Sequence, residues 1–500
     1  MLALEPRKPS LGLIMAFRAL LCLFSAACLA KQPNIIFLFS DDHAPAAISA
    51  YGPSHLTTGG FASTPNIDRI AKTGMIFQSC YVANSICTPS RAAILTGQHS
   101  HHNGVYTLQD PMDPQRRHLA HWFTEAGYQT ALYGKWHLET SPQGFQTWEV
   151  FRNQGEYRNP TYLTPDAPKK GHTEKGYADE VSTDKALGWL QKRDPSKPFL
   201  LCLHFKAPHR NWIPAERYAR RFEGVTIPEP KTLLDDWKNR SDAITLNRQT
   251  IGRDMGLSDL KVPKPKGLQG DALRQWAYQR YIKDYLNTAQ VVDDSVGRVL
   301  DWLKANGLEE DTIVIYASDQ GFFTGEHGFF DKRLMYEPST RMPLIVRAPG
   351  VTQAGSESRA LASNIDFAPT LLELAGIHPK LSATEKFDGT SLVPLLRREI
   401  PDDWRTAVYY RYWEHNSGEH PVPNNFGIRT ATHKIICYQG QPHNMRGASK
   451  IATPEEWELF DLVKDPDEMI NVYKDPAYAD IRKTLTAQLK AERERNGDSR

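Results

Sequence analysis

Two apolar segments, each followed at once by acidic or amide side chains, constrain the fold of this chain most strongly. Residues 34–40 (Asn-Ile-Ile-Phe-Leu-Phe-Ser) and 312–318 (Thr-Ile-Val-Ile-Tyr-Ala-Ser) are short and almost continuously hydrophobic. Such runs are typical of strands that are buried on both faces, as in a parallel sheet covered by helices. The sequence therefore predicts an α/β fold with these two segments among its central strands.

Further strand-like and helical segments alternate with these two runs. We expect strands at residues 130–133, 199–205 and 343–347, and helices at residues 64–73, 119–126 and 285–306. A glycine follows each helical segment, which is a common way for a helix to end, and Thr64 is placed to cap the first helix. Strands that alternate with helices predict a largely parallel sheet.

The pattern changes after about residue 376. Short segments at residues 406–413, 426–430, 433–438 and 457–460 are predicted to be antiparallel strands, and a charged helix is predicted at 477–495. We therefore expect a smaller C-terminal α+β domain over residues 376–500 that completes the substrate pocket. The charged segment 220–270 is expected to be an ordered surface insertion.

The N-terminal segment is predicted to be a signal peptide over residues 1–30. The basic residues Arg7, Lys8 and Arg18 precede an apolar run at 19–29, which is too short to span a bilayer. Small residues follow this run, as they do before a cleavage site. We therefore expect the chain to be exported to the periplasm or the cell exterior, without an integral membrane span.

The charge balance and the cysteine count exclude two classes of protein. Lys and Arg number 60 against 58 Asp and Glu, for a formal net charge of +2, so bulk charge predicts no nucleic-acid partner. Beyond the predicted signal peptide the cysteines are Cys80, Cys87, Cys202 and Cys437. They are too few for a disulfide-dense scaffold. In an exported protein each of these thiols could still form a disulfide, and the sequence leaves open which of them do.

The two acidic clusters predict a metal site. Asp41 and Asp42 follow the first apolar run, and Asp319 and Gln320 follow the second. Ligands bind outside the carboxyl ends of parallel strands, and carboxylate and amide oxygens suit Ca²⁺ or Mg²⁺. Either cluster alone would more often cap the following turn. Both clusters at one edge favour a cation, because like charges that are brought together need one.

Asp293 and Asp294 form a contrasting acidic pair. They lie inside the predicted helix at 285–306, where consecutive side chains point about 100° apart. We interpret this pair as part of a helix surface, with one carboxylate buried and paired, and assign neither residue to a metal.

Positive and imidazole side chains follow several of the predicted strands. Lys135 and His137 follow the strand at 130–133, His209 follows 199–205, and Lys332 lies beyond the glycine-flanked segment 325–328. Each residue alone is a weak signal, since a single histidine or lysine usually has a structural role. Together with a cation they suit an anionic sulfate or phosphate ester, whose leaving oxygen must be protonated.

At this point the residues resemble a known family. Cys87-Thr-Pro-Ser-Arg91, followed by Leu95-Thr-Gly97, is similar to the signature of the type I sulfatases of the alkaline-phosphatase superfamily. The family's other motifs are matched in the same order by residues 41–42, 134–137, 207–209, 318–321 and 331–332. Two positions depart from the pattern: Gln98 replaces a basic residue, and Gln320 replaces the commoner Asn or His.

The resemblance implies a fold and a chemistry. The fold would be an alkaline-phosphatase-like mixed, largely parallel sheet sandwiched by helices, with the catalytic domain at 31–375. A separate maturation enzyme would oxidise Cys87 to Cα-formylglycine, whose hydrate would attack sulfur beside one Ca²⁺ per chain. The metal ligands would be Asp41, Asp42, residue 87, Asp319 and Gln320.

The resemblance also implies a role for each cationic side chain. Arg91 would hold the hydrated aldehyde and, together with Lys135, offset negative charge. His209 and Lys332 would bind sulfate and assist the leaving alcohol, and His137 would help to release sulfate from the covalent intermediate.

Among sulfatases, residues 325–336 and 426–430 resemble bacterial carbohydrate sulfatases, including N-acetylglucosamine-6-sulfatase-like members. A sulfated sugar or polysaccharide is therefore the expected substrate, with residues 409–413, Glu414 and His415 reaching over the pocket. Two alternatives are a phosphonate or phosphodiester hydrolase with the same modified cysteine, and an unmodified, inactive glycan-binding paralogue.

Overall fold

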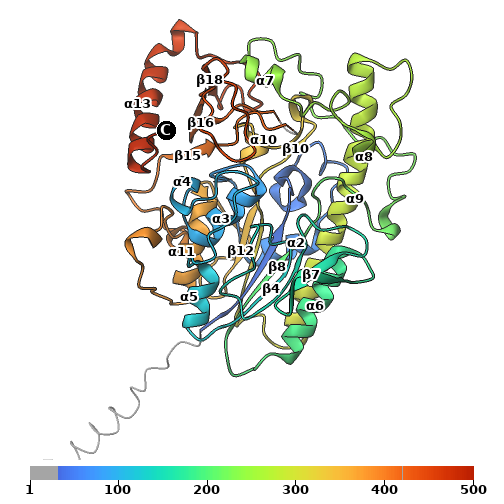
Figure 1. Cartoon of the computed structure of the whole chain (residues 1–500), viewed down its shortest axis with the longest axis vertical. Helices are drawn as coiled ribbons and strands as arrows, with labels where there is room; N and C mark the ends of the chain where they lie inside the picture. The colour runs from blue at the N-terminus through green and yellow to red at the C-terminus, as the bar shows by residue number, and fades with distance from the viewer. Residues whose placement is uncertain (1–31, 419–420) are drawn as a thin grey trace, which may run out of the picture.

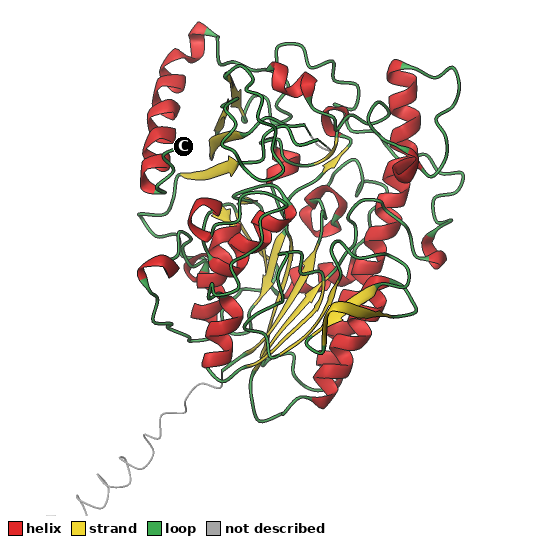
Figure 2. Cartoon of the chain, viewed as in Figure 1, coloured by secondary structure: helices red, strands yellow, loops and turns green. Residues whose placement is uncertain are grey.

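The computed structural model describes residues 32–418 and 421–500, so the predicted signal peptide lies outside the described residues. A ten-stranded sheet runs through the body of the molecule, and helices cover both of its faces (Figures 1 and 2). The strand order is β13 (Ser356–Ser358), β2 (Met75–Phe77), β12 (Leu344–Arg347), β9 (Thr312–Ser318), β1 (Asn34–Ser40), β8 (Phe199–His204), β4 (Gln129–Gly134), β5 (Thr147–Phe151), β6 (Thr161–Thr164) and β7 (Ala167–Thr173).

The centre of this sheet is parallel and its two sides contain antiparallel pairs. Strands β9, β1, β8, β4 and β5 pair in parallel, whereas β12 runs antiparallel to β9 and β6 runs antiparallel to β5. Asn34 pairs with Thr312 and Ser40 with Ser318, so the acidic segments that follow β1 and β9 leave the sheet side by side. The predicted α/β class, with a mixed and largely parallel sheet, is confirmed.

Alternate side chains of β1 enter two hydrophobic cores. Phe37 and Phe39 pack on one face and Ile36 and Leu38 on the other, all at most 1% exposed. The first core is covered by α3 (Cys87–Thr96), α5 (Leu119–Glu125) and α11 (Phe367–Leu374), and the second by α2 (Pro65–Thr73), α6 (Ala178–Lys192) and α9 (Gly270–Ala305). A strand that is buried on both faces must be apolar at every position, as β1 is.

The predicted helices are present, with one difference in length. The helix predicted at 285–306 is the C-terminal part of α9, which begins at Gly270. The predicted insertion at 220–270 contains α7 (Asp242–Leu246) and α8 (Leu257–Leu260), and it packs Leu233, Ile251 and Leu260 against α9. The short helices elsewhere are α4 (Ser100–Asn103), α10 (Glu337–Thr340) and α12 (Val393–Leu396).

The C-terminal region contains the predicted antiparallel sheet. Its strands are β15 (Ala407–Tyr412), β16 (Asn425–Thr430), β17 (His433–Tyr438) and β18 (Glu456–Asp461), and α13 (Ala479–Arg495) packs against them (Figure 1). Two small pairs, β3 (Cys80–Tyr81) with β14 (Ala362–Ser363) and β10 (Phe323–Thr324) with β11 (Phe330–Asp331), complete the strands. The boundary at 375/376 stays a prediction.

The described cysteines are all free, buried thiols, so those residues contain no disulfide. Over the same residues, no helix combines the length and the apolar character needed to cross a membrane.

The N-terminus of α2 is capped by a carboxylate from another helix. Thr64 occupies the N-cap position, as predicted, but its side chain makes no capping hydrogen bond. Asp293 of α9 instead accepts hydrogen bonds from the backbone N–H groups of Asn66 (3.0 Å) and Ile67 (2.9 Å). Asp293 is fully buried, whereas Asp294 lies at the surface and pairs with Arg217 at 2.6 Å. The pair thus has one buried, paired member, as expected.

We expect Asp293→Ala to lower the free energy of unfolding by about 2 kcal/mol, because it leaves buried N–H groups of α2 without acceptors. Asp294→Ala is the matched control and should cost about 1 kcal/mol or less, since its ion pair is exposed. Urea denaturation of both variants measures the difference, and equal costs would contradict the capping role.

The stability contributed by Asp293 should also depend on pH. Burial raises the pKa of Asp293 from 3.8 to about 6. Between these values the folded state holds a proton that the unfolded state has lost, so stability falls as the pH rises through this window. Asp293→Asn should remove this decrease in the free energy of unfolding with rising pH. Urea denaturation across the window measures it, and the same slope in the variant and the unaltered protein would contradict the role given to Asp293.

Candidate active site

Three carboxylates meet where β1 and β9 end. Asp41 and Asp42 follow β1, and Asp319 follows β9; all three are fully buried, and their oxygens lie within 4.8 Å of one another. Asp42 also donates its backbone N–H to Asp319 Oδ1 at 3.1 Å, which ties the two strand ends together. The parallel pairing of β1 with β9 therefore brings together two clusters that lie 277 residues apart in the chain.

Cys87 is the first residue of α3 and faces this cluster. Its Sγ lies 3.7 Å from Asp41 Oδ1 and 3.8 Å from Gln320 Nε2. Helix α3 is held against the end of β9 because the Ser90 hydroxyl donates to the carbonyl of Asp319 and accepts a hydrogen bond from Asn364 at 2.9 Å. Residue 87 is thus fixed beside the carboxylates by the helix that carries it.

A positive side chain pairs with each carboxylate. Lys135, just beyond β4, contacts Asp41 Oδ2, and Lys332, just beyond β11, lies 2.7 Å from Asp42 Oδ1. Arg91, one helical turn after Cys87, lies 3.2 Å from Asp319 Oδ2. With neutral histidines and all three carboxylates ionised, these three pairs sum to no net charge.

The pKa values of these groups follow from burial and from these pairs. Burial acts to raise the pKa of Asp41, but Lys135 and the neighbouring cations hold it well below its ordinary value. Burial and repulsion from Asp41 raise the pKa of Asp319 to about 7. Burial acts to lower the pKa of Lys332, but Asp42 raises it well above its ordinary value. A bound cation would reduce the electrostatic repulsion between carboxylates that are crowded together in this way.

Burial also raises the pKa of the Cys87 thiol to about 12. Cys87 is therefore a neutral thiol at physiological pH. The thiolate is the nucleophilic and metal-binding form of cysteine, so the unmodified side chain is suited to neither task.

Both predicted histidines lie near the cluster. His209 follows β8, and its Nε2 lies 3.9 Å from Asp42 Oδ2. His137 has a left-handed backbone (φ 52°), and its Nδ1 lies 3.5 Å from the hydroxyl oxygen of Thr88, next to Cys87. Burial, reinforced by Lys135, lowers the pKa of each histidine well below its usual value, so both are neutral at physiological pH.

The donor set fits a hard cation. Three carboxylates and Gln320 offer oxygen ligands, which Ca²⁺ prefers. Gln320 Nε2 points to Asp42 Oδ1 at 2.5 Å, while its buried Oε1 has no hydrogen-bond partner. A half-turn of the amide plane places that oxygen toward the carboxylates, where a cation would take it as a ligand. The ligand assignment of these residues stays a prediction.

Sequence reasoning predicted that residues 409–415 reach over the pocket, but it assigned no role to Arg333, the neighbour of Lys332. Arg333 is buried, and its Nε has no hydrogen-bond partner. Burial acts to lower the pKa of Arg333, but Asp331, Tyr412 and Glu414 raise it, which places the last residue of β15 and the nearby Glu414 beside the site. The Tyr412 hydroxyl is also buried without a partner. Only the fold brings Tyr412 and Glu414 to Arg333, so no local motif predicts this contact.

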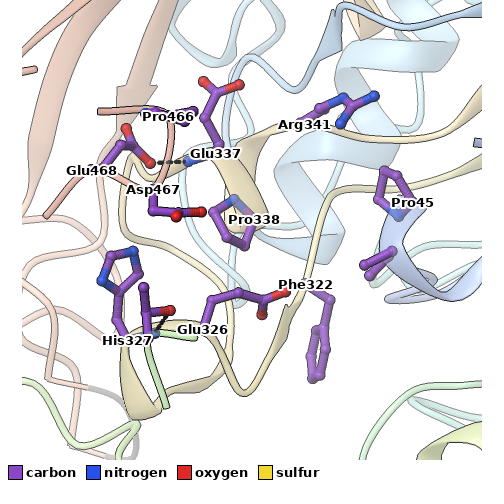
Figure 3. Close-up of a pocket in the computed structure, with 13 residues that line it drawn as sticks. Pro45, Phe322, Glu326, His327, Glu337, Pro338, Arg341, Pro466, Asp467 and Glu468 are labelled. Atoms are coloured by element: carbon purple, nitrogen blue, oxygen red, sulfur yellow. Dashed lines mark hydrogen bonds between the residues drawn. The ribbon is translucent and has the colours of Figure 1, made fainter. Parts of the chain in front are cut away.

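A separate cavity, shown in Figure 3, has several acids in its lining but none of the predicted site residues. Glu468 accepts the backbone N–H of Glu337 at 2.6 Å, and Lys434 pairs with both carboxylates. Glu326 accepts hydrogen bonds from Thr324. These acids have partners that hold the fold together, so the cavity is not assigned to the reaction.

Known protein families match this chain over most of its length. A family model described as Sulfatase matches residues 33–377, and a second model, N-sulphoglucosamine sulphohydrolase, C-terminal, matches residues 325–495.

Full-length relatives also match. An N-acetylglucosamine-6-O-sulfatase of Bacteroides thetaiotaomicron is 40% identical over 92% of this chain and 86% of its own length. The human N-acetylglucosamine-6-sulfatase is 28% identical over 92% of this chain and 85% of its own length. One solved structure, of a protein in complex with its substrate D-glucosamine-2-N,6-O-disulfate, has a TM-score of 0.85 at 38% identity and covers 94% of this chain and 99% of that one.

Proposed function

Since the chain belongs to the sulfatase family and is a sulfuric ester hydrolase that acts on carbohydrate, we propose that it removes the 6-O-sulfate from a glucosamine unit. The 40% identical relative is named for N-acetylglucosamine 6-O-sulfate, and the 38% identical structure holds a 6-O-sulfated glucosamine. The observation that carries the proposal is Cys87, on the first turn of α3, 3.7 Å from a carboxylate of the acidic cluster.

We propose that a maturation enzyme converts Cys87 to Cα-formylglycine and that Asp41, Asp42, Asp319 and Gln320 hold one Ca²⁺ with it. The hydrated aldehyde supplies a nucleophilic oxygen and a second hydroxyl for sulfate release, and Ca²⁺ supplies positive charge for the oxyanions. This proposal accounts for a thiol placed among hard oxygen ligands, where sulfur itself is a poor ligand.

The positive side chains bind and orient the anionic ester. The three ionised carboxylates and their three cationic partners cancel in charge. A bound divalent cation would therefore leave an excess of positive charge, which attracts an anionic sulfate monoester. Arg91 stays bound to Asp319 and to the carbonyl of Lys135 at 3.1 Å, which orients it beside residue 87. Lys135 and Lys332 are the ammonium groups closest to the carboxylates, and we propose that they contact the sulfate oxygens.

Different residues are proposed to act as the acid and the base of the reaction. His209 Nδ1 lies 2.6 Å from the carbonyl of Arg210, so that nitrogen carries the proton and Nε2 faces Asp42. Lys332, whose pKa is raised by Asp42 against the effect of burial, remains charged and is the acid available to the leaving alcohol. His137 is neutral because burial lowers its pKa, so it is a base for the hydroxyl that releases sulfate.

Recognition of the sugar is proposed for residues beside Lys332. Buried polar atoms without partners are rare in folded proteins, so the free Nε of Arg333 and hydroxyl of Tyr412 mark a place for ligand oxygens. Glu414 also acts on Arg333. This assignment supports the expectation that residues of the 409–415 stretch contribute to sugar binding.

We expect sulfate release from N-acetylglucosamine 6-sulfate to exceed release from the 3-sulfate isomer by about 100-fold or more, because the sugar contacts orient one ester toward residue 87. Ion chromatography of free sulfate measures both rates. A phosphonate monoester tests the alternative hydrolase, and its faster hydrolysis would contradict the proposed function. Binding of the sulfated sugar without turnover would instead indicate the inactive glycan-binding paralogue.

Export to the periplasm or cell exterior is also part of the proposal, through the predicted signal peptide. A fusion of residues 1–30 to a periplasmic reporter measures it, and a reporter that stays in the cytoplasm would contradict it.

A further inference from the structure

Gln154 contacts the ring of His137 on the side that faces away from α3. Gln154 lies in the loop after β5, and its Nε2 is 3.1 Å from His137 Nε2. Glu139 Oε1 lies 3.9 Å from the same ring nitrogen. The other ring nitrogen, Nδ1, faces Thr88 on α3. His137 is therefore oriented with Nε2 toward the loop and Nδ1 toward the helix that carries residue 87.

The loop that carries Gln154 is itself held by buried groups. Lys206, which is 4% exposed, donates from Nζ to the carbonyl of Gln154 at 3.0 Å, and its Nζ lies 4.7 Å from the centre of the Tyr157 ring. The fully buried Asp179 accepts the backbone N–H groups of Lys206 at 2.7 Å and Ala207 at 3.1 Å. The backbone of Gln154 is thus tied to the segment that leads from β8 to His209.

The same loop also reaches the second histidine. The Tyr157 hydroxyl donates to the carbonyl of His209 at 2.5 Å. Residues 154–157, which we call the positioning loop, therefore contact a side chain of one histidine and the backbone of the other. Such a loop keeps the two active-site histidines, His137 and His209, in a fixed relation.

The tautomer of His137 decides whether it can act on residue 87. Only Nδ1 faces α3, so a base at that side needs its lone pair on Nδ1 and its proton on Nε2. An amide can meet Nε2 with either its oxygen or its nitrogen, depending on how its planar group is turned. The nearby carboxylate of Glu139 favours a proton on Nε2. The oxygen of the Gln154 amide is buried without a hydrogen-bond partner, and a half-turn of the amide brings it to Nε2 in place of the nitrogen, where it accepts this proton.

We infer that Gln154 is a positioning residue that accepts the Nε2–H of His137 and so directs the Nδ1 lone pair toward residue 87, with Lys206 holding Gln154 in place. The inference rests on the proposed function for the role of His137, but the geometry of the contact is independent of it. It adds to the reaction a residue that lies in none of the sequence motifs.

We expect Gln154→Leu to lower kcat by about 10- to 100-fold with KM changed less than about twofold, as when other outer partners that orient a histidine are removed. Lys206→Met should show a smaller loss of the same kind. Gln143→Leu, an exposed glutamine in the loop after His137, is the matched control and should retain the activity of the unaltered enzyme. Equal activity of Gln154→Leu and Gln143→Leu would overturn the inference.

A double-mutant cycle separates positioning from a general structural effect. In a His137→Ala background, Gln154→Leu should cost nothing further, because the residue acts through His137. Gln154→Glu should raise the pKa of His137 and move the acidic limb of the kcat profile to higher pH by about one unit. A Gln154→Leu loss that persists undiminished in the His137→Ala background would overturn the inference.

The tautomer can be measured without turnover, which separates this inference from the proposed function. ¹⁵N-histidine NMR of the full calcium-loaded protein, with His137→Ala for assignment, should show Nε2 protonated and Nδ1 unprotonated. Gln154→Leu should shift this balance toward the other tautomer. A protonated Nδ1 in the unaltered protein would overturn the inference even if the enzyme hydrolyses sulfate esters.

Discussion

Cys87→Ala should lower sulfate-ester hydrolysis by at least about 10⁴-fold, as expected when a nucleophile is removed. The fold should survive, because the change removes one buried sulfur atom and leaves α3 tied to β9 through Ser90. The free energy of unfolding should fall by about 1 kcal/mol. Rates of sulfate release and urea denaturation measure the two effects on the same preparation.

Cys202→Ala is the matched control for this variant. Cys202 is also a fully buried free thiol, but it lies within β8, away from the strand ends. Its replacement should cost similar stability and leave turnover intact. Near-normal activity of Cys87→Ala would contradict the covalent scheme.

Asp319→Ala should remove both calcium and activity. Asp319 offers a carboxylate to the cluster, accepts the Asp42 N–H at 3.1 Å and pairs with Arg91 at 3.2 Å, so its loss disrupts the ligands and the cation beside residue 87. We expect bound calcium to fall well below one per chain and kcat to fall by about 10³-fold or more. Plasma emission spectroscopy of dialysed protein measures the metal.

The control for Asp319→Ala is Asp294→Ala, which removes a surface carboxylate paired with Arg217. This control should retain calcium and activity. Calcium content that is the same in Asp319→Ala and the unaltered protein would contradict the ligand assignment, even if turnover fell. Dialysis of the unaltered protein against a chelator should cause a loss of activity that added Ca²⁺ restores.

The strand-end residues were predictable because strand pairing alone brings them together. An uninterrupted apolar run marks a strand buried on both faces, and whatever follows two such parallel strands must meet at one edge. Asp41, Asp42, Asp319 and Gln320 could therefore be placed in one cluster from the sequence. Cys87 needed the family resemblance, since nothing in its own segment fixes where α3 docks.

Other features depend on contacts that leave no local pattern. The edge strand β7 reads Ala-Pro-Lys-Lys-Gly-His-Thr and is largely exposed, so it carries no hydrophobic alternation that would predict a strand. Asp293 caps a helix that lies 227 positions earlier in the chain. Gln154 is an unremarkable loop residue until the fold places it against His137. In each case the partner is known only once the chain is folded.

Mass spectrometry of residue 87 tests the central claim most directly. The protein should be purified in active form from a host with the maturation enzyme, and the tryptic peptide that ends at Arg91 analysed without alkylation. The account predicts a peptide lighter by the difference between a thiol side chain and an aldehyde, and reactive toward a hydrazide probe. An active preparation whose peptide carries only the intact thiol at Cys87 would contradict it.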